Sequence, residues 1–248
     1  MIILSILFFI TAILYSSVGF GGGSTYLALL LIWDIPYYIF PVIALTCNII
    51  VVSGNSFNYM RAGNYNIRLI LPFLFGSIPA AFIGGSLEIN KEIFEILLFL
   101  VLSIAGLLLL LNNKSYEDNE YKIRKLNLVF SFLIGLILGL VSGIVGIGGG
   151  IFLSPILFLL KAEKPKIIVT TASLFILINS ISGILGQFTK DTVLNEISLY
   201  WPLFLSVFFG GLLGNYLNLK IFSNSVLALI TSLLVIFISI RMALRIFF

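Results

Sequence analysis

Val18-Gly-Phe-Gly-Gly-Gly23 and Val145-Gly-Ile-Gly-Gly-Gly150 are two copies of one motif, 127 residues apart, in an otherwise strongly apolar chain. Each copy lies inside an uncharged stretch that is too long for a single membrane helix, Ile2–Ile32 and Leu126–Leu160. As one helix the first stretch would reach about 47 Å, against about 30 Å of hydrocarbon in a bilayer. Glycine weakens a helix by about 1 kcal/mol relative to alanine. Three consecutive glycines therefore predict a broken helix in each copy.

The composition excludes a soluble domain. Of the 248 residues, 60% are hydrophobic and 10% are charged, and the mean hydropathy is +1.19. A soluble domain of this length needs far more polar surface. The net charge of +4 is expected to report membrane topology rather than nucleic-acid binding. No basic region precedes the first apolar residues, so we expect the N-terminus to be a membrane segment and not a cleaved signal.

Six further uncharged stretches have about the length of one spanning helix. They are Ile35–Met60, Leu69–Leu87, Ile96–Asn113, Ile167–Thr189, Ile197–Leu219 and Ile221–Ile240. The sequence therefore predicts an all-α polytopic membrane protein with about eight transmembrane segments. Trp33 and Trp201 lie close to segment ends, which is typical of the interfacial aromatic belt.

The repeat extends beyond the glycine motif. Gly54 and Gly183, and likewise Gly84 and Gly214, keep nearly the same separation as the two motifs. Internal duplication is common in secondary transporters. We therefore expect two homologous halves of four hydrophobic segments each. The expected domains are residues 1–113, a charged linker at residues 114–125, and residues 126–248.

The sequence leaves the relative orientation of the halves open. If each long stretch crosses the membrane once, Lys and Arg divide nine to five between the two sides. If each long stretch is a full helix followed by a short helix that folds back, they divide ten to four. Because positive residues favour the cytoplasmic side, the second arrangement fits slightly better. In that arrangement the two halves are inverted.

Each break predicts an anion site. Broken backbone in hydrocarbon costs several kcal/mol per unpaired group unless protein, water or substrate satisfies it. The short helices after the breaks, Ser24–Leu31 and Ile151–Leu160, would present their N-termini near mid-membrane. Such an end carries about half a positive charge and free N–H donors, so it binds anions without a cationic side chain. Close helix packing is the alternative interpretation of the glycines.

Hydroxyl and amide side chains near the breaks complete the candidate site. Together they would form a neutral hydrogen-bonding shell for an oxyanion, although each Ser or Thr could instead bond to its own helix or a neighbouring one. The candidate substrate-binding residues are Gly19, Gly21, Gly22, Gly23, Ser24, Thr25, Asn48, Asn55, Gly146, Gly148, Gly149, Gly150, Thr170, Thr171, Ser173 and Gln187.

The missing residue types narrow the function. The chain has no histidine, and no Asp, Glu, Lys or Arg lies within the eight stretches. Proton coupling through a buried side chain is therefore disfavoured, and we expect no enzyme, no metal site and no cofactor. The leading hypothesis is a plasma-membrane secondary transporter whose partners are a small anion and the lipid bilayer. The alternative is a non-transporting scaffold or subunit, and the sequence leaves a homodimer open.

Two stretches, Ser17-Val-Gly-Phe-Gly-Gly-Gly-Ser24 and Ser142-Gly-Ile-Val-Gly-Ile-Gly-Gly-Gly150, resemble the duplicated signature of the TauE/SafE family of sulfite exporter-like membrane proteins. Thr170-Thr-Ala-Ser-Leu-Phe175 and Gly210-Gly-Leu-Leu-Gly214 are similar to its supporting pattern. The resemblance covers essentially the whole chain. It implies export or uptake of sulfur-containing organic or inorganic anions across the plasma membrane, without a prosthetic group. Where the family often has a histidine in the later half, this chain has Gln187 and Phe188.

Overall fold

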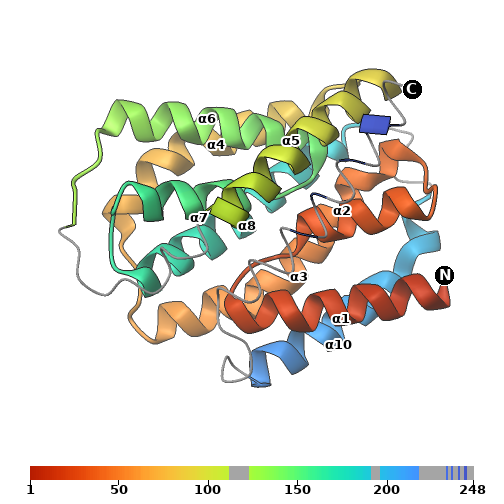
Figure 1. Ribbon diagram of the computed structural model, residues 1–248, viewed down its shortest axis with the longest axis horizontal. Helices are drawn as coiled ribbons and strands as arrows, with labels where there is room; N and C mark the ends of the chain where they lie inside the picture. The colour runs from red at the N-terminus through yellow and green to blue at the C-terminus, as the bar shows by residue number, and fades with distance from the viewer. Residues whose placement is uncertain are drawn as a thin grey trace.

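The computed structural model describes residues 1–111, 123–190 and 196–217, with five isolated positions beyond them, and every regular element in these ranges is a helix (Figure 1). The α-helices are α1 (Ile2–Val18), α2 (Gly23–Ile32), α3 (Phe40–Arg61), α4 (Ile67–Ser86), α5 (Lys91–Leu111), α6 (Leu128–Val145), α7 (Gly150–Leu159), α8 (Pro165–Gln187) and α10 (Trp201–Leu217). Two 3-10 turns, η1 (Tyr37–Ile39) and η2 (Ile197–Tyr200), precede α3 and α10. Most of the predicted linker 114–125 and of the predicted segment Ile221–Ile240 lies outside the described residues.

Five helical stretches in the described part of the chain are long and apolar enough to cross a membrane. They are Tyr37–Arg61, Ile67–Ser86, Leu128–Val145, Pro165–Gln187 and Ile197–Tyr216. The helices α1, α2 and α7 are apolar but shorter. The predicted all-α multi-pass membrane protein is thereby confirmed, and the total of eight segments stays a prediction.

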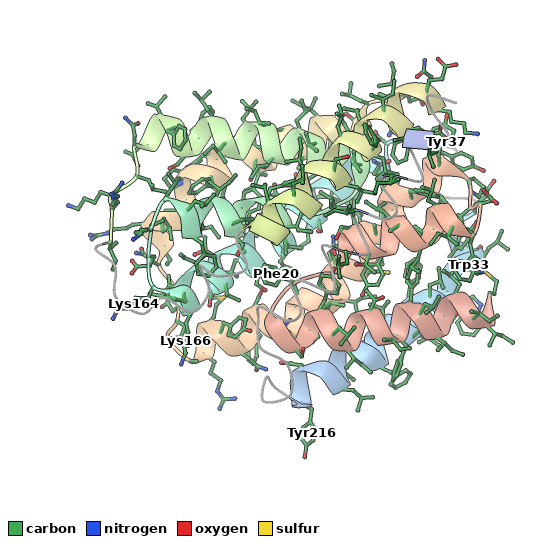
Figure 2. The ribbon with its side chains drawn as sticks, viewed as in Figure 1. Phe20, Trp33, Tyr37, Lys164, Lys166 and Tyr216 are labelled. Atoms are coloured by element: carbon green, nitrogen blue, oxygen red, sulfur yellow. The ribbon has the colours of Figure 1, made fainter. Side chains whose placement is uncertain are left out.

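Both over-long stretches are broken at their glycines, as predicted. The first forms α1 and α2, which are separated by residues 19–22, and the second forms α6 and α7, separated by residues 146–149. Each short helix starts one residue earlier than expected, because the last glycine of each motif is already helical. In Figure 2, Phe20 of the first break lies about midway between Trp33 and Tyr37 at one end and Lys164 and Lys166 at the other.

Two pairs of helices pack backbone to backbone through small residues. On α4 and α6, Gly76 faces the carbonyl oxygen of Phe132, and Gly84 faces that of Leu140. Because the contacts advance along both helices together, α4 and α6 run parallel. The helices α1 and α10 also run parallel, since Gly210 and Gly214 of α10 face successive turns of α1. Small residues allow such close approach where lipid supplies no hydrophobic driving force between helices.

The helices α3 and α8 form the centre of the bundle. In the most apolar 18 residues of each span, 61% of the residues are buried for the span that contains α3 and 67% for α8. The corresponding share is 33% for the span that contains α10. The two helices contact each other across the two halves of the sequence, where the hydroxyls of Ser56 and Ser173 lie 3.0 Å apart. Polar side chains on α3 and α8 therefore lie in the protein interior rather than against lipid.

The two ends of the bundle differ in charge within the described ranges. We call the end that contains the α2–α3, α4–α5 and α8–α10 connections the Lys190 face, and the opposite end the Lys161 face. The Lys190 face carries Lys91 and Lys190 with Asp34, Glu88, Glu92, Glu95 and Glu196. The Lys161 face carries Arg61, Arg68, Arg124, Lys125, Lys161, Lys164 and Lys166 with Glu163. The cations thus gather at one end and the acids at the other.

Candidate functional site

The first break is closed by backbone hydrogen bonds and by left-handed glycines. After α1, the amide of Phe20 donates to the carbonyl oxygen of Tyr15 over 3.0 Å. Gly19 has φ 87° and Gly22, which precedes α2, has φ 86°. A residue with a Cβ is destabilised by roughly 1–2 kcal/mol in this region, so the conformation favours glycine.

The second break repeats this arrangement. The amide of Gly146 donates to the carbonyl oxygen of Ser142 over 2.8 Å, and Gly146 ends α6 with φ 90°. Gly148 and Gly149 follow with φ 80° and 73°. In both copies the residue that precedes the short helix is a glycine with no side chain to cap the helix N-terminus. The first N–H groups of α2 and α7 therefore receive no acceptor from a capping side chain.

The two breaks meet at the side chain of Asn48 on α3. A Cβ added at Gly23 would lie 2.7 Å from the carbonyl oxygen of Ile147 in the second break and 2.8 Å from Asn48 Nδ2. A Cβ added at Gly148 would also lie 2.8 Å from Asn48 Nδ2, and Gly21 packs still more closely on Asn48 Oδ1. One amide thus contacts both halves of the sequence, and a larger residue at any of these three glycines would force the Asn48 side chain or its neighbours to shift.

The Asn48 amide has no hydrogen-bond partner in the described part of the chain. Its residue is fully buried, and neither Oδ1 nor Nδ2 is paired. Leaving a buried polar group unpaired costs about 1–3 kcal/mol. Ser180 on α8 is also fully buried, and its unpaired hydroxyl lies 3.3 Å from a Cβ added at Gly148. Sequence reasoning missed Ser180, since a serine inside an apolar helix carries no distinguishing pattern.

The remaining predicted residues lie in several environments. The Thr25 hydroxyl on α2 is 2.7 Å from the Tyr15 hydroxyl, whereas the Ser24 hydroxyl is buried and unpaired. Thr170 and Thr171 donate to carbonyl oxygens of their own helix over 2.9 and 2.8 Å, so their hydroxyl protons are used within α8.

Asn55, Ser173 and Gln187 complete the predicted set. Asn55 is buried with Nδ2 unpaired, two turns beyond Asn48 and therefore about 10 Å further along α3. Ser173 pairs with Ser56, as described above. Gln187, at the end of α8, donates from Nε2 to the carbonyl oxygen of Gly143 over 2.8 Å.

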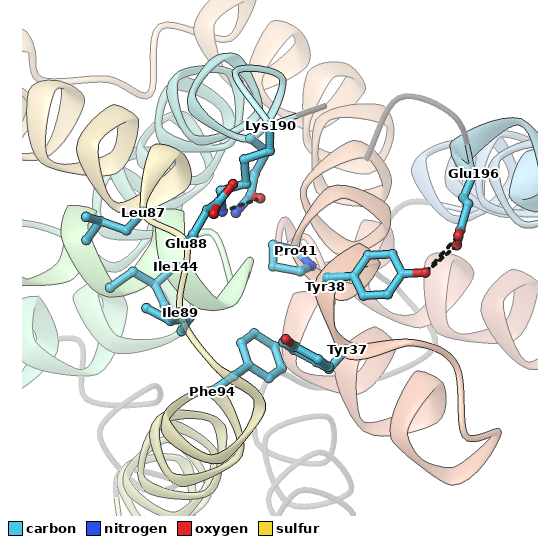
Figure 3. A pocket seen from close by; sticks show the side chains of 11 residues that line it. Tyr37, Tyr38, Pro41, Leu87, Glu88, Ile89, Phe94, Ile144, Lys190 and Glu196 are labelled. Atoms are coloured by element: carbon cyan, nitrogen blue, oxygen red, sulfur yellow. Dashed lines mark hydrogen bonds between the residues drawn. The ribbon is translucent and has the colours of Figure 1, made fainter. Parts of the chain in front are cut away.

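A cavity of about 560 Å³ opens at the Lys190 face, and we call it the vestibule (Figure 3). Its lining residues are Tyr37, Tyr38, Pro41, Leu87, Glu88, Ile89, Phe94, Ile144, Gln187, Lys190 and Glu196. Its floor adjoins the second break, because a Cβ added at Gly146 would clash with the backbone of Pro41. Sequence reasoning did not find the vestibule, since its lining comes from segments that are far apart in the chain.

Two polar pairs lie on different walls of the vestibule (Figure 3). The Lys190 ammonium donates to Gln187 Oε1 over 3.1 Å. Partial burial lowers the pKa of Lys190 below its usual value, and the charge of Glu88 opposes that shift. On the other wall, the Tyr38 hydroxyl lies 2.8 Å from both carboxylate oxygens of Glu196. In the sequence analysis, Lys190 counted only as one of the charges that indicate membrane topology. The structure shows that it lines the vestibule.

Comparison with known proteins identifies relatives along nearly the whole chain. Residues 4–242 match the family model described as sulfite exporter TauE/SafE. A probable membrane transporter protein of Sinorhizobium fredii is 26% identical over 232 residues, which is 93% of each chain. One of Bacillus subtilis is 24% identical and covers 95% of this chain and 94% of its own. One of Methanocaldococcus jannaschii is 30% identical and covers 77% and 73%.

No solved structure matches the chain. The family match spans both glycine breaks, Asn48 and the vestibule. Together with the apolar spanning helices, it identifies a multi-pass membrane protein of a transporter family. The chain therefore belongs to the sulfite exporter TauE/SafE family.

Proposed function

We propose that this protein is a secondary transporter that moves a small anion, a sulfur oxyanion or an organosulfonate, across the plasma membrane. The observation that carries the proposal is the Asn48 amide, which is fully buried, unpaired and in contact with both glycine breaks. A protein gains no stability from such a group. A bound oxyanion would accept hydrogen bonds from the N–H groups of Nδ2 and so remove the cost of leaving that donor unpaired.

We call the place where the two breaks meet at Asn48 the glycine crossing. Its electrostatics suit a ligand with a single negative charge. The helices α2 and α7 both begin there, and each helix N-terminus acts as about half a positive charge. The sequence places no acid or base in either break, so no side-chain charge competes with the anion. Because the surroundings are largely apolar, these partial charges act more strongly than they would in water.

We further propose that the transporter consists of two inverted halves, residues 1–113 and 126–248. The pairing of α1 with α10 and of α6 with α4 supports this, since the first helix of each half lies parallel to the third hydrophobic segment of the other half. The helix α1 begins at the Lys190 face and α6 at the Lys161 face. The excess of cations at the Lys161 face favours that face as cytoplasmic.

The scaffold alternative fits the same fold less well. A scaffold has no use for backbone breaks at mid-membrane or for an amide that no protein group satisfies. Small-residue packing accounts for the glycines of α4, α6 and α10, which face helix backbones. It does not account for Gly21, Gly23 and Gly148, which make room for a polar side chain.

The test replaces Asn48 with leucine, whose side chain has the same branched arrangement of four heavy atoms but no hydrogen-bonding group. Asn48→Leu removes an unpaired buried amide, so we expect the ligand-free protein to become about 1–3 kcal/mol more stable. We expect sulfite flux into proteoliposomes to fall at least about tenfold, because hydrogen bonds to a charged group contribute roughly 1.5–3 kcal/mol. Thermal unfolding and flux are measured on the same preparation.

Asn58→Leu is the matched control. Asn58 lies on α3, is exposed and bonds to Asn215 over 3.0 Å, so its replacement removes an amide from the same helix away from the breaks. It should leave flux unchanged. If Asn48→Leu lowers stability and leaves flux intact, Asn48 is a structural residue and the proposed site is wrong.

A further inference from the structure

The vestibule contains one cation and two carboxylates. Lys190 and Glu88 lie together on one wall and Glu196 on the other (Figure 3). Within the described ranges no carboxylate lies within ion-pair distance of Lys190, whose ammonium bonds instead to the neutral amide of Gln187. Among the described residues, an anion that reaches the ammonium therefore displaces no paired carboxylate.

The vestibule leads toward the proposed binding site. Gln187 links the Lys190 ammonium to Gly143 in the last turn of α6, three residues before the second break. Pro41 and Ile144 line the vestibule and lie beside that break. An anion held by Lys190 would thus lie beside the second break, and Asn48 is about 10 Å further along α3 from Pro41.

We propose, on the basis of the anion transport proposed above, that the pathway admits singly charged oxyanions and rejects doubly charged ones. In this assignment Lys190 binds the anion at the mouth, and the carboxylates of Glu88 and Glu196 exclude the second negative charge. Hydrogen sulfite and alkyl sulfonates belong to the accepted class, and sulfate belongs to the excluded class.

Charge counting supports this selection at both sites. At the mouth, one ammonium stands against two carboxylates, and the attraction and the repulsions all double for a dianion, so the summed charge of the three groups, which is negative, disfavours a dianion twice as strongly as a monoanion. At the glycine crossing, two helix N-termini supply about one positive charge in total. The cost of removing an ion from water grows with the square of its charge, so a dianion pays about four times as much. Nothing described along the route compensates for that cost.

The experiment compares methanesulfonate with sulfate, which are tetrahedral sulfur oxyanions of similar size that differ by one charge. Their affinities for the purified full-length protein are measured by calorimetric titration at constant ionic strength. For the unmodified protein we expect methanesulfonate to bind at least about tenfold more tightly. In the double variant Glu88→Gln/Glu196→Gln we expect that ratio to fall about tenfold, because sulfate gains more than methanesulfonate.

Lys190→Met should weaken both anions about tenfold, since a charge-assisted hydrogen bond is lost. Lys91→Met is the matched control. Lys91 lies at the same face, is paired with Glu95 over 3.9 Å and does not line the vestibule, so its loss should leave both affinities unchanged. Glutamine at residue 196 can still accept from Tyr38, so that substitution keeps the wall intact.

Equal affinities for the two anions, or a ratio that the double variant leaves unchanged, would overturn the charge selection. The proposed function would still stand if Asn48→Leu abolished flux in the same protein. If the unmodified protein neither bound nor transported either monoanion, methanesulfonate or hydrogen sulfite, both the proposed function and the charge selection would fall.

Discussion

The two glycine breaks share one backbone design and differ in the side chains around them. In both breaks the first helix ends at a left-handed glycine, and a second left-handed glycine precedes the short helix. In the first break, Asn48 packs on Gly21 and Gly23, whereas in the second Ile176 packs on Gly148 and Gly150. The fold thus repeats the opening in the backbone, but Asn48 of the first half has both amide atoms unpaired, whereas Asn179 of the second half has only Oδ1 unpaired.

The short helices also differ in how they are held. The Thr25 hydroxyl bonds to Tyr15, which joins α2 to α1. Phe152 occupies the matching position of α7 and packs into the apolar core. The first break is therefore held by a polar contact and the second by apolar packing. This asymmetry suits a site that binds one anion rather than two.

The largest effect is expected where the two breaks touch. Gly23→Ala places a methyl group 2.7 Å from the Ile147 carbonyl oxygen and 2.8 Å from the Asn48 amide. Since backbone cannot move aside cheaply, we expect a loss of about 1–3 kcal/mol in the free energy of unfolding. We also expect sulfite flux to fall to that of empty liposomes.

Gly211→Ala is the control for this change. A Cβ at residue 211 would make only ordinary contact with Val51, at 3.7 Å, so this helical glycine should tolerate alanine with unchanged flux. If Gly23→Ala also transports normally, the two breaks do not need to touch and their contact carries no function.

The second prediction exchanges the side chains that distinguish the breaks. In Asn48→Leu/Ile176→Asn the amide moves to the second break, where residue 176 meets Gly148 and Gly150 but no glycine of the first break. We therefore expect flux to stay as low as in Asn48→Leu alone. Recovery of flux in the exchanged protein would show that the two breaks are chemically equivalent.

The smallest effect concerns the polar contact of α2. Thr25→Val removes the hydroxyl that pairs with Tyr15 and keeps the side-chain shape. A neutral hydrogen bond contributes about 0.5–1.5 kcal/mol, so we expect a loss of about 1 kcal/mol in the free energy of unfolding. Thr46→Val removes a hydroxyl that donates to its own helix at Val42 and should be nearly neutral. Equal losses for both variants would mean that the Tyr15 contact does not hold the first break.

The sequence predicted the membrane class and the breaks because both depend on local properties. Apolar stretches of about 20 residues report spanning helices, and a run of glycines interrupts a helix wherever it occurs. The polar residues were harder to interpret. Asn48 and Thr171 were equal candidates by sequence, yet the Asn48 amide is unpaired where the breaks meet and the Thr171 hydroxyl is bonded within α8. Which face of a helix turns toward the site depends on its neighbours.

By itself, then, the sequence determined that the chain lies in a membrane and that its backbone opens within Val18–Gly23 and Val145–Gly150. Only the tertiary structure decided that these openings meet at Asn48 and that Lys190 lines a vestibule beside the second one. The reason is physical. Glycine and apolar runs act through the local backbone and the solvent, whereas these contacts join residues that can be more than 100 positions apart and exist only once the helices pack.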